Sequence, residues 1–382
     1  MNVLTLTTLY PNALQPRHGI FVRNRLCAID ALEGFERRVV APVPHCPLVS
    51  MVSDRYKLYE NMPAQETRDG VKVYHPKYFT LPGVSFFDNA ISMAKAAESI
   101  IEQLYPDNEQ FDLIDGQYLY PDGVAAYHFA RKHGKPLILT ARGSDVNYWM
   151  EQKKARSQIL EAIEYADQVI CVSAALKKSL LEHGIDENKL SVVINGVDPT
   201  CFNANVAANP LREEYYLSVG NLIPLKGHDI TLNAFEGLPR KRLIIVGDGE
   251  QRENLKKQAI NLGIQKRVQF IKHLEQDKLA EFYAGATATI LMSSMEGMPN
   301  VVLESLAVGT PVIASDVGGI SEVVNKDNGI LLKGRYEYEL IDALNNIGSL
   351  DRSREQISNT VEQYRWSDVA QYQFEIYENA LA

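Results

Sequence analysis

Residues 289–324, TILMSSMEGMPNVVLESLAVGTPVIASDVGGISEVV, constrain the fold of this chain more than any other stretch. The first five residues are an apolar run typical of a buried strand, and MEGMP is a turn built from glycine and proline. From Asn300 the apolar residues recur with helical spacing, and Gly309 lies where a helix C-cap belongs. TPVIAS has the composition of a buried parallel strand, and Asp316 to Gly319 is predicted to open a second helix. This order of elements indicates an α/β fold.

Two carboxylates stand in this stretch, Glu296 in the loop and Glu304 in the predicted helix, separated by seven residues. A loop that leads into a helix has backbone N–H groups without intrahelical partners, and these suit an anion or a sugar hydroxyl. Because Glu304 lies about one turn into the helix, its side chain can point back toward the same ligand. Such an arrangement fits a sugar nucleotide. The alternative is a solvated acidic turn followed by a surface glutamate.

EGMPNVVLESLAVGTPVIASDVGG, from Glu296 onward, resembles the E-x7-E signature of the retaining glycosyltransferases of family 4. The resemblance implies an α/β fold of the GT-B type, with two Rossmann-like domains facing each other across a cleft. It implies that Glu296 and the amides after it hold the donor sugar, and that Glu304 binds the ribose. The donor contacts expected in this loop are Gly297, Met298, Pro299, Asn300 and Val301.

The whole-chain composition excludes several classes of protein. A length of 382 residues favours two domains over one core, and a formal net charge of −9 argues against a nucleic-acid binder. The four cysteines form no CxxC pair, which fits a reducing cytoplasm better than disulfides or zinc. No apolar run approaches the ~18 residues of a membrane span, and the N-terminus lacks the features of a signal peptide. We expect a cytoplasmic protein, and the sequence leaves its oligomeric state open.

Strand–helix alternation occurs once in each half of the chain, which predicts two Rossmann-like domains. Residues 1–200 would form the N-terminal, acceptor-side domain, 201–212 a linker, and 213–365 the C-terminal domain that binds the sugar nucleotide. Residues 366–382 resemble the final helix of the family, which returns to the N-terminal domain.

Two loops of the N-terminal half carry candidate site residues. Gly19 stands between a predicted strand and a helix, so a phosphate or an acceptor can approach its backbone, and in the family this loop faces the cleft. The family's His-Gly-x-Asp motif reads Arg-Gly-Ser-Asp at residues 142–145, so no role of the histidine is transferred. Arg142 suits a phosphate or an acidic sugar. The alternative is a salt bridge between Arg142 and Asp145 with no ligand.

The C-terminal half opens with YYLSVGNLIPLKGHDITLNAF, a strand, a turn at Gly220 and Lys226 at the start of a helix. A glycine turn with a lysine at a helix N-terminus suits a diphosphate through charge and free N–H groups. The family has arginine where this chain has Asn221, so the clamp is weaker here or Arg142 supplies the missing cation. VGDGE matches a family turn whose glycines line the nucleotide pocket, which adds Gly247 to the candidates.

The resulting hypothesis is a retaining hexosyltransferase-type glycosyltransferase, with Glu296, Lys226 and Arg142 as candidate catalytic residues. It would move a sugar from a UDP-sugar or GDP-sugar to a saccharide or lipid-linked acceptor in polysaccharide biosynthesis. The chain has no Asp-x-Asp, so we expect no metal and no cofactor. Two alternatives remain, a sugar-nucleotide 2-epimerase of the same architecture and a non-catalytic nucleotide-binding protein.

The candidate membrane contact is KYFTLPGVSFF, residues 77–87, an apolar segment with Arg55, Lys57 and Lys72 as basic residues nearby. Enzymes of the resembled family often build polysaccharides on lipid carriers. An apolar loop with basic neighbours suits reversible attachment to the inner face of a membrane. The alternative is that these aromatic residues belong to the core.

Overall fold

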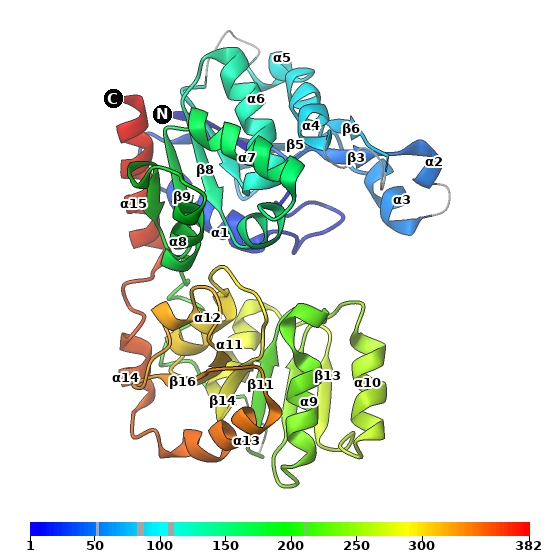
Figure 1. Ribbon diagram of the computed structural model, residues 1–382, viewed down its shortest axis with the longest axis vertical. Coiled ribbons are helices and arrows are strands. Elements are labelled where there is room, and N and C mark those ends of the chain that lie inside the picture. The colour runs from blue at the N-terminus through cyan, green and yellow to red at the C-terminus, as the bar shows by residue number, and fades with distance from the viewer. Residues whose placement is uncertain (51–52, 82–87, 106–110, 210, 212) are drawn as a thin grey trace. The chain divides into compact units, whose positions relative to one another are not determined.

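The computed structural model describes residues 1–50, 53–81, 88–105, 111–209, 211 and 213–382. The chain divides into two compact units, unit 1 with Met1–Asn195 and Trp366–Ala382, and unit 2 with Gly196–Arg365 (Figure 1). The described residues of segment 201–212, which we interpreted as a linker, belong to unit 2. In the described part of the chain, no helix combines the length and the apolar character needed to cross a bilayer.

Unit 1 is built on an eight-stranded sheet of order β10-β9-β8-β7-β1-β2-β5-β4. Its described pairs are parallel apart from β4–β5, which is antiparallel, and β3 pairs with β6 separately. The strands are β1 Asn2–Leu6, β2 Glu36–Val40, β3 Val43–His45, β4 Gln65–Arg68, β5 Val71–Tyr74, β6 Lys77–Phe79, β7 Leu113–Gln117, β8 Leu137–Ala141, β9 Gln168–Cys171 and β10 Leu190–Val192. Strands β1, β7 and β8 are almost entirely buried, as expected of parallel strands covered on both faces, and β7 carries the buried polar residues Asp115 and Gln117.

The helices of unit 1 include one that comes from the end of the chain. Helix α15 packs beside α1, and its Trp366, Val369 and Tyr377 share one apolar cluster with Val22 and Leu26 of α1. The helices are α1 Ile20–Asp30, α2 Pro47–Ser50, α3 Asp54–Glu60, α4 Asn89–Glu98, α5 Ile101–Leu104, α6 Val124–His133, α7 Lys153–Tyr165, α8 Ala174–Glu182 and α15 Trp366–Leu381, with short helical turns at Leu119–Gly123, Asp145–Trp149 and Glu187–Lys189.

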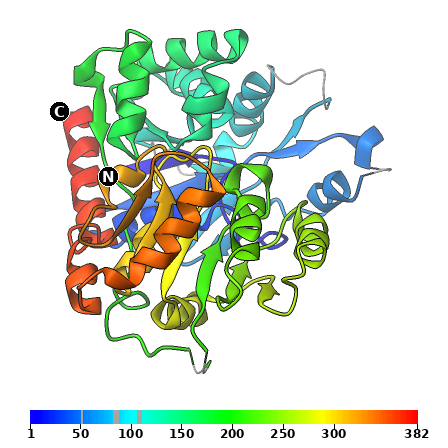
Figure 2. The ribbon, with the colours of Figure 1, turned by 60° about the horizontal axis from the view of Figure 1, so that its bottom comes forward.

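Unit 2 is a parallel six-stranded sheet of order β13-β12-β11-β14-β15-β16. The strands are β11 Tyr216–Val219, β12 Leu243–Val246, β13 Val268–Ile271, β14 Ala288–Leu291, β15 Val312–Ser315 and β16 Gly329–Leu332. The helices are α9 His228–Glu236, α10 Arg252–Asn261, α11 Gln276–Gly285, α12 Asn300–Ala307, α13 Glu337–Asn346 and α14 Arg354–Asn359, with 3-10 turns at Pro224–Lys226, Ile320–Glu322 and Ile347–Ser349. Helices α9 and α13 lie side by side (Figure 2).

The strand order of unit 2 reverses between β11 and β14, since β12 lies on one side of β11 and β14 on the other. In open α/β sheets, ligands bind beyond the carboxyl ends of the strands at such a switch point. The loops that follow β11 and β14 are the ones that carry Lys226 and Glu296. The fold therefore brings the two sequence motifs of the C-terminal half to one edge.

The two sheets with their helices confirm the α/β class and the two Rossmann-like units. Helix α12 begins at Asn300 as predicted, and Gly309 has the positive φ of 86° that suits a residue just after a helix. The second helix predicted after Gly319 is wrong, because only the turn Ile320–Glu322 forms. The Asn328 side chain bonds the Asn325 N–H and the Val323 carbonyl, both at 2.8 Å, and turns the chain into β16.

Candidate functional site

Glu296 and Lys226 form an ion pair at the carboxyl edge of the unit 2 sheet. Lys226 Nζ donates to Glu296 Oε1 at 2.5 Å, and Ser293 Oγ donates to the same oxygen at 2.6 Å. The side chains are 9% exposed for Glu296 and 21% for Lys226, so the pair is largely withdrawn from water but reachable. Charge-assisted hydrogen bonds of this kind are short and orient both groups. Glu296 therefore orients the Lys226 ammonium group at this edge of the sheet.

Two glycines bring the loops of this edge into backbone contact. A Cβ on Gly227 would lie 2.1 Å from the Met292 carbonyl oxygen, and one on Gly318 would lie 2.2 Å from the Glu296 carbonyl oxygen. Gly319 N–H also donates to the Gly297 carbonyl at 2.8 Å. Only glycine allows such an approach without displacement. The loop after β15 therefore fixes the backbone of Glu296.

The other predicted glycines meet at the ends of β11 and β12. Gly220 N–H donates to the Val246 carbonyl at 3.0 Å, and a Cβ on Gly247 would lie 1.9 Å from the Gly220 carbonyl oxygen. Asn221, which follows Gly220, is exposed at this edge. These three predicted donor contacts are thus neighbours of one another and of the loop that ends at Lys226.

Glu304 lies in α12, where the Tyr283 hydroxyl of α11 donates to its Oε2 at 3.2 Å. Burial raises the pKa of Glu304 from its ordinary value of 4.5 to about 7, although the hydrogen bond from Tyr283 opposes the rise. Of the remaining predicted contacts in this motif, Gly297, Met298 and Pro299 are buried, and Asn300 and Val301 are partly exposed. The carboxylates of the motif therefore differ in environment, one paired with a lysine and one with a phenol.

The raised pKa gives a testable pH dependence. The folded state keeps a proton on Glu304 between about pH 4.5 and 7 that the unfolded state releases, so this contribution to stability is lost as the pH rises through that range. Glu304→Gln is expected to match the wild type at pH 5 and to exceed it at pH 8 by on the order of 1–3 kcal/mol, because a desolvated charge is removed. Urea unfolding at both pH values measures this difference. A variant that is less stable than the wild type at pH 8 would contradict the raised pKa.

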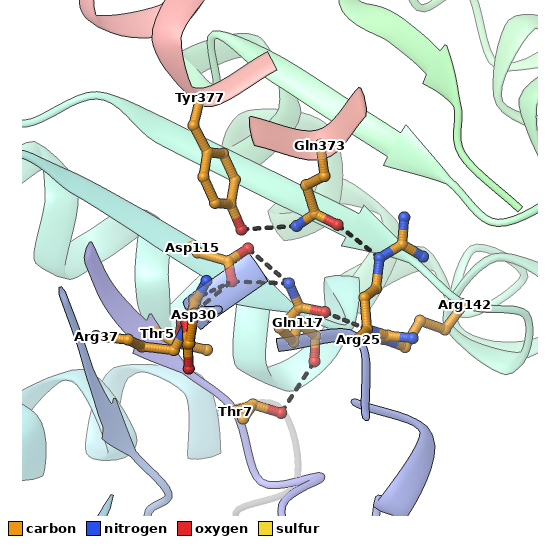
Figure 3. Close-up of polar contacts among 10 residues, drawn as sticks. All are labelled: Thr5, Thr7, Arg25, Asp30, Arg37, Asp115, Gln117, Arg142, Gln373 and Tyr377. Carbon is orange, nitrogen blue, oxygen red and sulfur yellow. Dashed lines mark hydrogen bonds and ion pairs between the residues drawn. The ribbon is translucent and has the colours of Figure 1, made fainter. Parts of the chain in front are cut away.

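Arg142 lies in unit 1, in the loop after β8, against a buried polar network (Figure 3). Its Nη2 donates to Gln117 Oε1, and Gln117 Nε2 donates to both Asp115 oxygens at 2.7 and 2.8 Å. The guanidinium carbon lies 5.2 Å from the centroid of the Phe21 ring. The arginine is therefore oriented by an amide and an aromatic ring.

The alternative of an Arg142–Asp145 salt bridge is not what the structure shows. Asp145 instead accepts hydrogen bonds from the backbone N–H groups of its own loop and of the turn after β7. These N–H groups belong to Arg142, Gly143, Val146 and Leu119. The Asp145 carboxylate therefore accepts from backbone N–H groups, and the Arg142 side chain donates to Gln117.

Gly19 immediately precedes α1 and has a φ of 67°. A Cβ there would lie 2.2 Å from the Leu9 carbonyl oxygen, so the loop after β1 packs closely against the start of the helix. Phe21, which contacts the Arg142 guanidinium, is in the first turn of the same helix. Gly19 and Arg142, predicted from separate motifs, therefore belong to one region of unit 1.

Sequence reasoning did not single out Ser293, Gln117 and Tyr283, and it gave Gly318 only the role of a helix start. Gln117 is the last residue of β7, and Ser293 follows β14 by two positions. The rule that ligands gather at the carboxyl ends of parallel strands could have found both. No pattern in the sequence around Gly318 indicates its close contact with the Glu296 backbone.

Metal-ligand chemistry has no candidate among the described residues. No group of three or more His, Cys, Asp or Glu side chains there is arranged to hold a metal ion. The cysteines Cys27, Cys46, Cys171 and Cys201 are free thiols.

The predicted membrane contact is described only in part. Phe86 and Phe87 lie outside the described residues, as does the whole of 82–87. Before them, Phe79 is 57% exposed and Leu81 is 37% exposed, whereas Tyr78 is buried. The described end of this segment thus exposes two large apolar side chains.

Two family models match the chain, "Glycosyltransferase Family 4" over residues 48–200 and "Glycosyl transferases group 1" over residues 202–364. A glycosyltransferase of Methanocaldococcus jannaschii, itself uncharacterized, is 32% identical over 68% of this chain and 69% of its own length. TuaC of Bacillus subtilis, whose name assigns it to teichuronic acid biosynthesis as a glycosyltransferase, is 29% identical over 90% of this chain and 88% of its own.

Solved structures resemble the fold over nearly the whole chain. Sucrose-phosphate synthase from Thermosynechococcus elongatus superposes with a TM-score of 0.82 at 19% identity, covering 99% of this chain and 98% of that one. HepE of Anabaena in complex with UDP-glucose has a TM-score of 0.69 at 20% identity, with 99% of both chains covered. At these identities the likeness establishes a shared fold.

Proposed function

As a family 4 glycosyltransferase of the GT-B fold, this chain moves a sugar from a nucleotide-sugar donor, and we propose that it does so with retention of anomeric configuration and without a metal ion. The observation that carries this proposal is the Glu296–Lys226 pair at 2.5 Å. The pair lies where β11 and β14 form the switch point of the unit 2 sheet. Glu296 would position the donor sugar, and Lys226 would neutralise the diphosphate.

The chemistry follows from the groups at this edge. As the sugar leaves, negative charge grows on the diphosphate, and Lys226 with the N-terminal amides of α12 would stabilise it. Preorganised donors of this kind contribute about 3–4 kcal/mol each. Glu296 would support positive charge at the anomeric carbon, and Glu304 would accept from the ribose hydroxyls. Attack on the face that the phosphate leaves, with the phosphate taking the acceptor proton, gives retention without an enzyme nucleophile.

The donor is proposed to be a UDP-hexose or a GDP-hexose, and the acceptor a saccharide or a lipid-linked saccharide in polysaccharide biosynthesis. The HepE structures with UDP and UDP-glucose make UDP-sugars the first donors to test. The assignment of TuaC to teichuronic acid biosynthesis supports a polysaccharide role. Exposed Phe79 and Leu81 support a reversible contact with a membrane that carries such an acceptor.

Incubation with UDP-, GDP- and ADP-sugars followed by proton NMR tests the function. When no acceptor is present, a transferase is expected to hydrolyse the donor slowly and release the nucleotide. The sugar released first, before it mutarotates, should keep the anomeric configuration that it had in the donor. A sugar-nucleotide 2-epimerase would form the epimeric donor, and a non-catalytic protein would bind without turnover. Either of these outcomes, or an inverted sugar, contradicts the proposal.

Transfer is expected to continue undiminished in excess EDTA, because Lys226 and the helix amides would supply the positive charge that a metal supplies elsewhere. Nucleotide release with and without EDTA, after removal of bound metal, measures this. Strict dependence on an added divalent ion, restored on titration with Mg²⁺ or Mn²⁺, would show that the charge is supplied by a metal instead.

A further inference from the structure

Among the described residues, no carboxylate forms an ion pair with the side chains of Arg25 and Arg142 in unit 1. Arg25 is fully buried, and its hydrogen-bond acceptors are Gln373 Oε1 at 2.6 Å, the Val193 carbonyl at 3.1 Å and Asn195 Oδ1 at 3.4 Å. Arg142 donates to the Gln117 amide (Figure 3). By contrast, Arg37 in the same network pairs with Asp30 at 2.7 Å and Asp115 at 3.2 Å. Arg25 and Arg142 are therefore held by amide and carbonyl oxygens, whereas Arg37 is held by carboxylates.

Arg142 also has hydrogen-bonding capacity that the protein does not use. Its Nε and Nη1 are buried and have no partner among the described residues. A buried donor left without an acceptor costs about 1–3 kcal/mol, and more when it is charged. Burial lowers the pKa of Arg142 to about 10, and burial with the nearby Arg142 charge lowers that of Arg25 to about 9. The burial of these guanidinium groups thus has a cost that a bound anion would relieve.

The start of α1 adds a second feature that favours an anion. Helix α1 has eleven residues, and none of the side chains that the structure describes caps its N-terminus. The first N–H groups of a helix have no intrahelical acceptors and carry partial positive charge. Phe21 in this first turn lies under the Arg142 guanidinium, which brings the helix start and the arginine together.

Gln117 fixes the direction of the arginine. Both Asp115 oxygens accept from its Nε2, so its Oε1 must face the other way, toward Arg142 (Figure 3). Arg142 as a whole is partly exposed, so part of its side chain is accessible to a ligand. The relay from Asp115 through Gln117 makes Gln117 a positioning residue for Arg142.

We propose that Arg142 and the amino end of α1 form an anion site in unit 1, which binds a carboxylate or a phosphate group carried by a substrate. The site is distinct in its residues from the Lys226 edge of unit 2. Its assignment to a substrate rests on the proposed transferase function, whereas anion binding itself stands on unit 1 alone. The chain would accordingly prefer an acidic substrate to its uncharged analogue.

The first test measures anion binding by thermal shift at constant ionic strength, with inorganic phosphate, D-glucuronate and uncharged D-glucose as probes. We expect one of the two anions to stabilise the wild type at millimolar concentration and D-glucose to have no effect. Glucuronate alone would identify a carboxylate-bearing substrate, and phosphate alone a phosphorylated one. Absence of stabilisation by both anions overturns the proposal.

Variants then locate the site. Arg142→Gln should raise the half-saturating anion concentration at least tenfold, and Arg142→His, measured at pH 8, should do the same. Arg352→Gln is the control, because it removes an exposed arginine of unit 2 that pairs with Asp327. Equal weakening in this control, or loss of binding in Lys226→Gln but not in Arg142→Gln, would overturn the assignment.

A structural role for Arg142 gives a different result. Removing a desolvated charge with unpartnered donors should leave the melting temperature of ligand-free Arg142→Gln unchanged or higher. A fall of more than several degrees, with Arg142→Lys restoring it and no change in anion binding, would make the arginine structural. Nucleotide release from UDP-sugars separates the two proposals. If release fails while Arg142-dependent anion binding holds, only the transferase proposal fails, and the reverse result removes only the anion site.

Discussion

Glu296→Gln is expected to lower the turnover number at least ~10²-fold, roughly 2.7 kcal/mol in the barrier, with the fold unchanged. Glutamine keeps the shape of the side chain but cannot balance the Lys226 charge or support positive charge at the anomeric carbon. The 2.5 Å contact with Lys226 and the 2.6 Å contact with Ser293 show that this carboxylate is already positioned before a ligand enters. Steady-state transfer or donor hydrolysis measures the loss, and circular dichroism checks the fold.

Glu253→Gln is the matched control, because Glu253 also pairs with a lysine of unit 2, Lys256, at 2.8 Å. That pair is exposed to solvent, where water and salt screen the attraction, so it contributes little to stability. Its removal is expected to leave turnover unchanged. Near-normal turnover in Glu296→Gln would contradict the proposed role of Glu296, whatever the control shows.

Gly318→Ala is expected to reduce turnover by roughly 10²-fold and to destabilise unit 2. The added Cβ would lie 2.2 Å from the Glu296 carbonyl oxygen and 3.1 Å from that of Gly297, so the loop that carries Glu296 must move. A displacement of about 1 Å at a reacting group can cost on the order of 10²-fold in rate. The left-handed backbone adds about 1–2 kcal/mol and the overpacking about 1–3 kcal/mol of lost stability. Urea unfolding and turnover measure the two effects separately.

Gly263→Ala separates the contact from the backbone conformation. Gly263 has a φ of 69°, close to the 59° of Gly318, but a Cβ there meets nothing within 4 Å. It should show only the conformational cost of about 1–2 kcal/mol and normal turnover. If both glycine variants retain turnover to the same degree, the backbone contact does not position Glu296.

Local patterns predicted the core of unit 2 well, because they depend on neighbours in sequence. The helical spacing after Asn300 and the stop at Gly309 both appear in α12. The helix expected after Gly319 failed because the Asn328 side chain bonds the backbone at Val323 and Asn325, which turns the chain. That turn depends on a residue beyond the pattern that suggested a helix.

Contacts between side chains that are far apart in the sequence could not be predicted from the spacing of residues along the chain. The Lys226–Glu296 pair spans 70 positions, and only the common strand edge made a meeting plausible. In the sequence, Asp145 is three positions from Arg142 and was the candidate partner. Backbone N–H groups instead donate to that carboxylate, and the Arg142 side chain donates to Gln117, 25 positions away. Because buried backbone N–H groups need acceptors, those of this loop bond Asp145, and the Arg142 side chain bonds another residue.

Hydrogen exchange in the presence of a nucleoside diphosphate tests most directly that the donor binds at the carboxyl edge of unit 2. With whichever of UDP, GDP and ADP stabilises the protein most, we predict protection in peptides covering 219–228, 296–304 and 316–320. The opposite edge of the same sheet has a cavity of about 250 Å³, lined in part by Leu211, Tyr215 and Arg242, and should be unchanged. Protection at that cavity, or no protection of the Lys226 and Glu296 loops, would contradict the account.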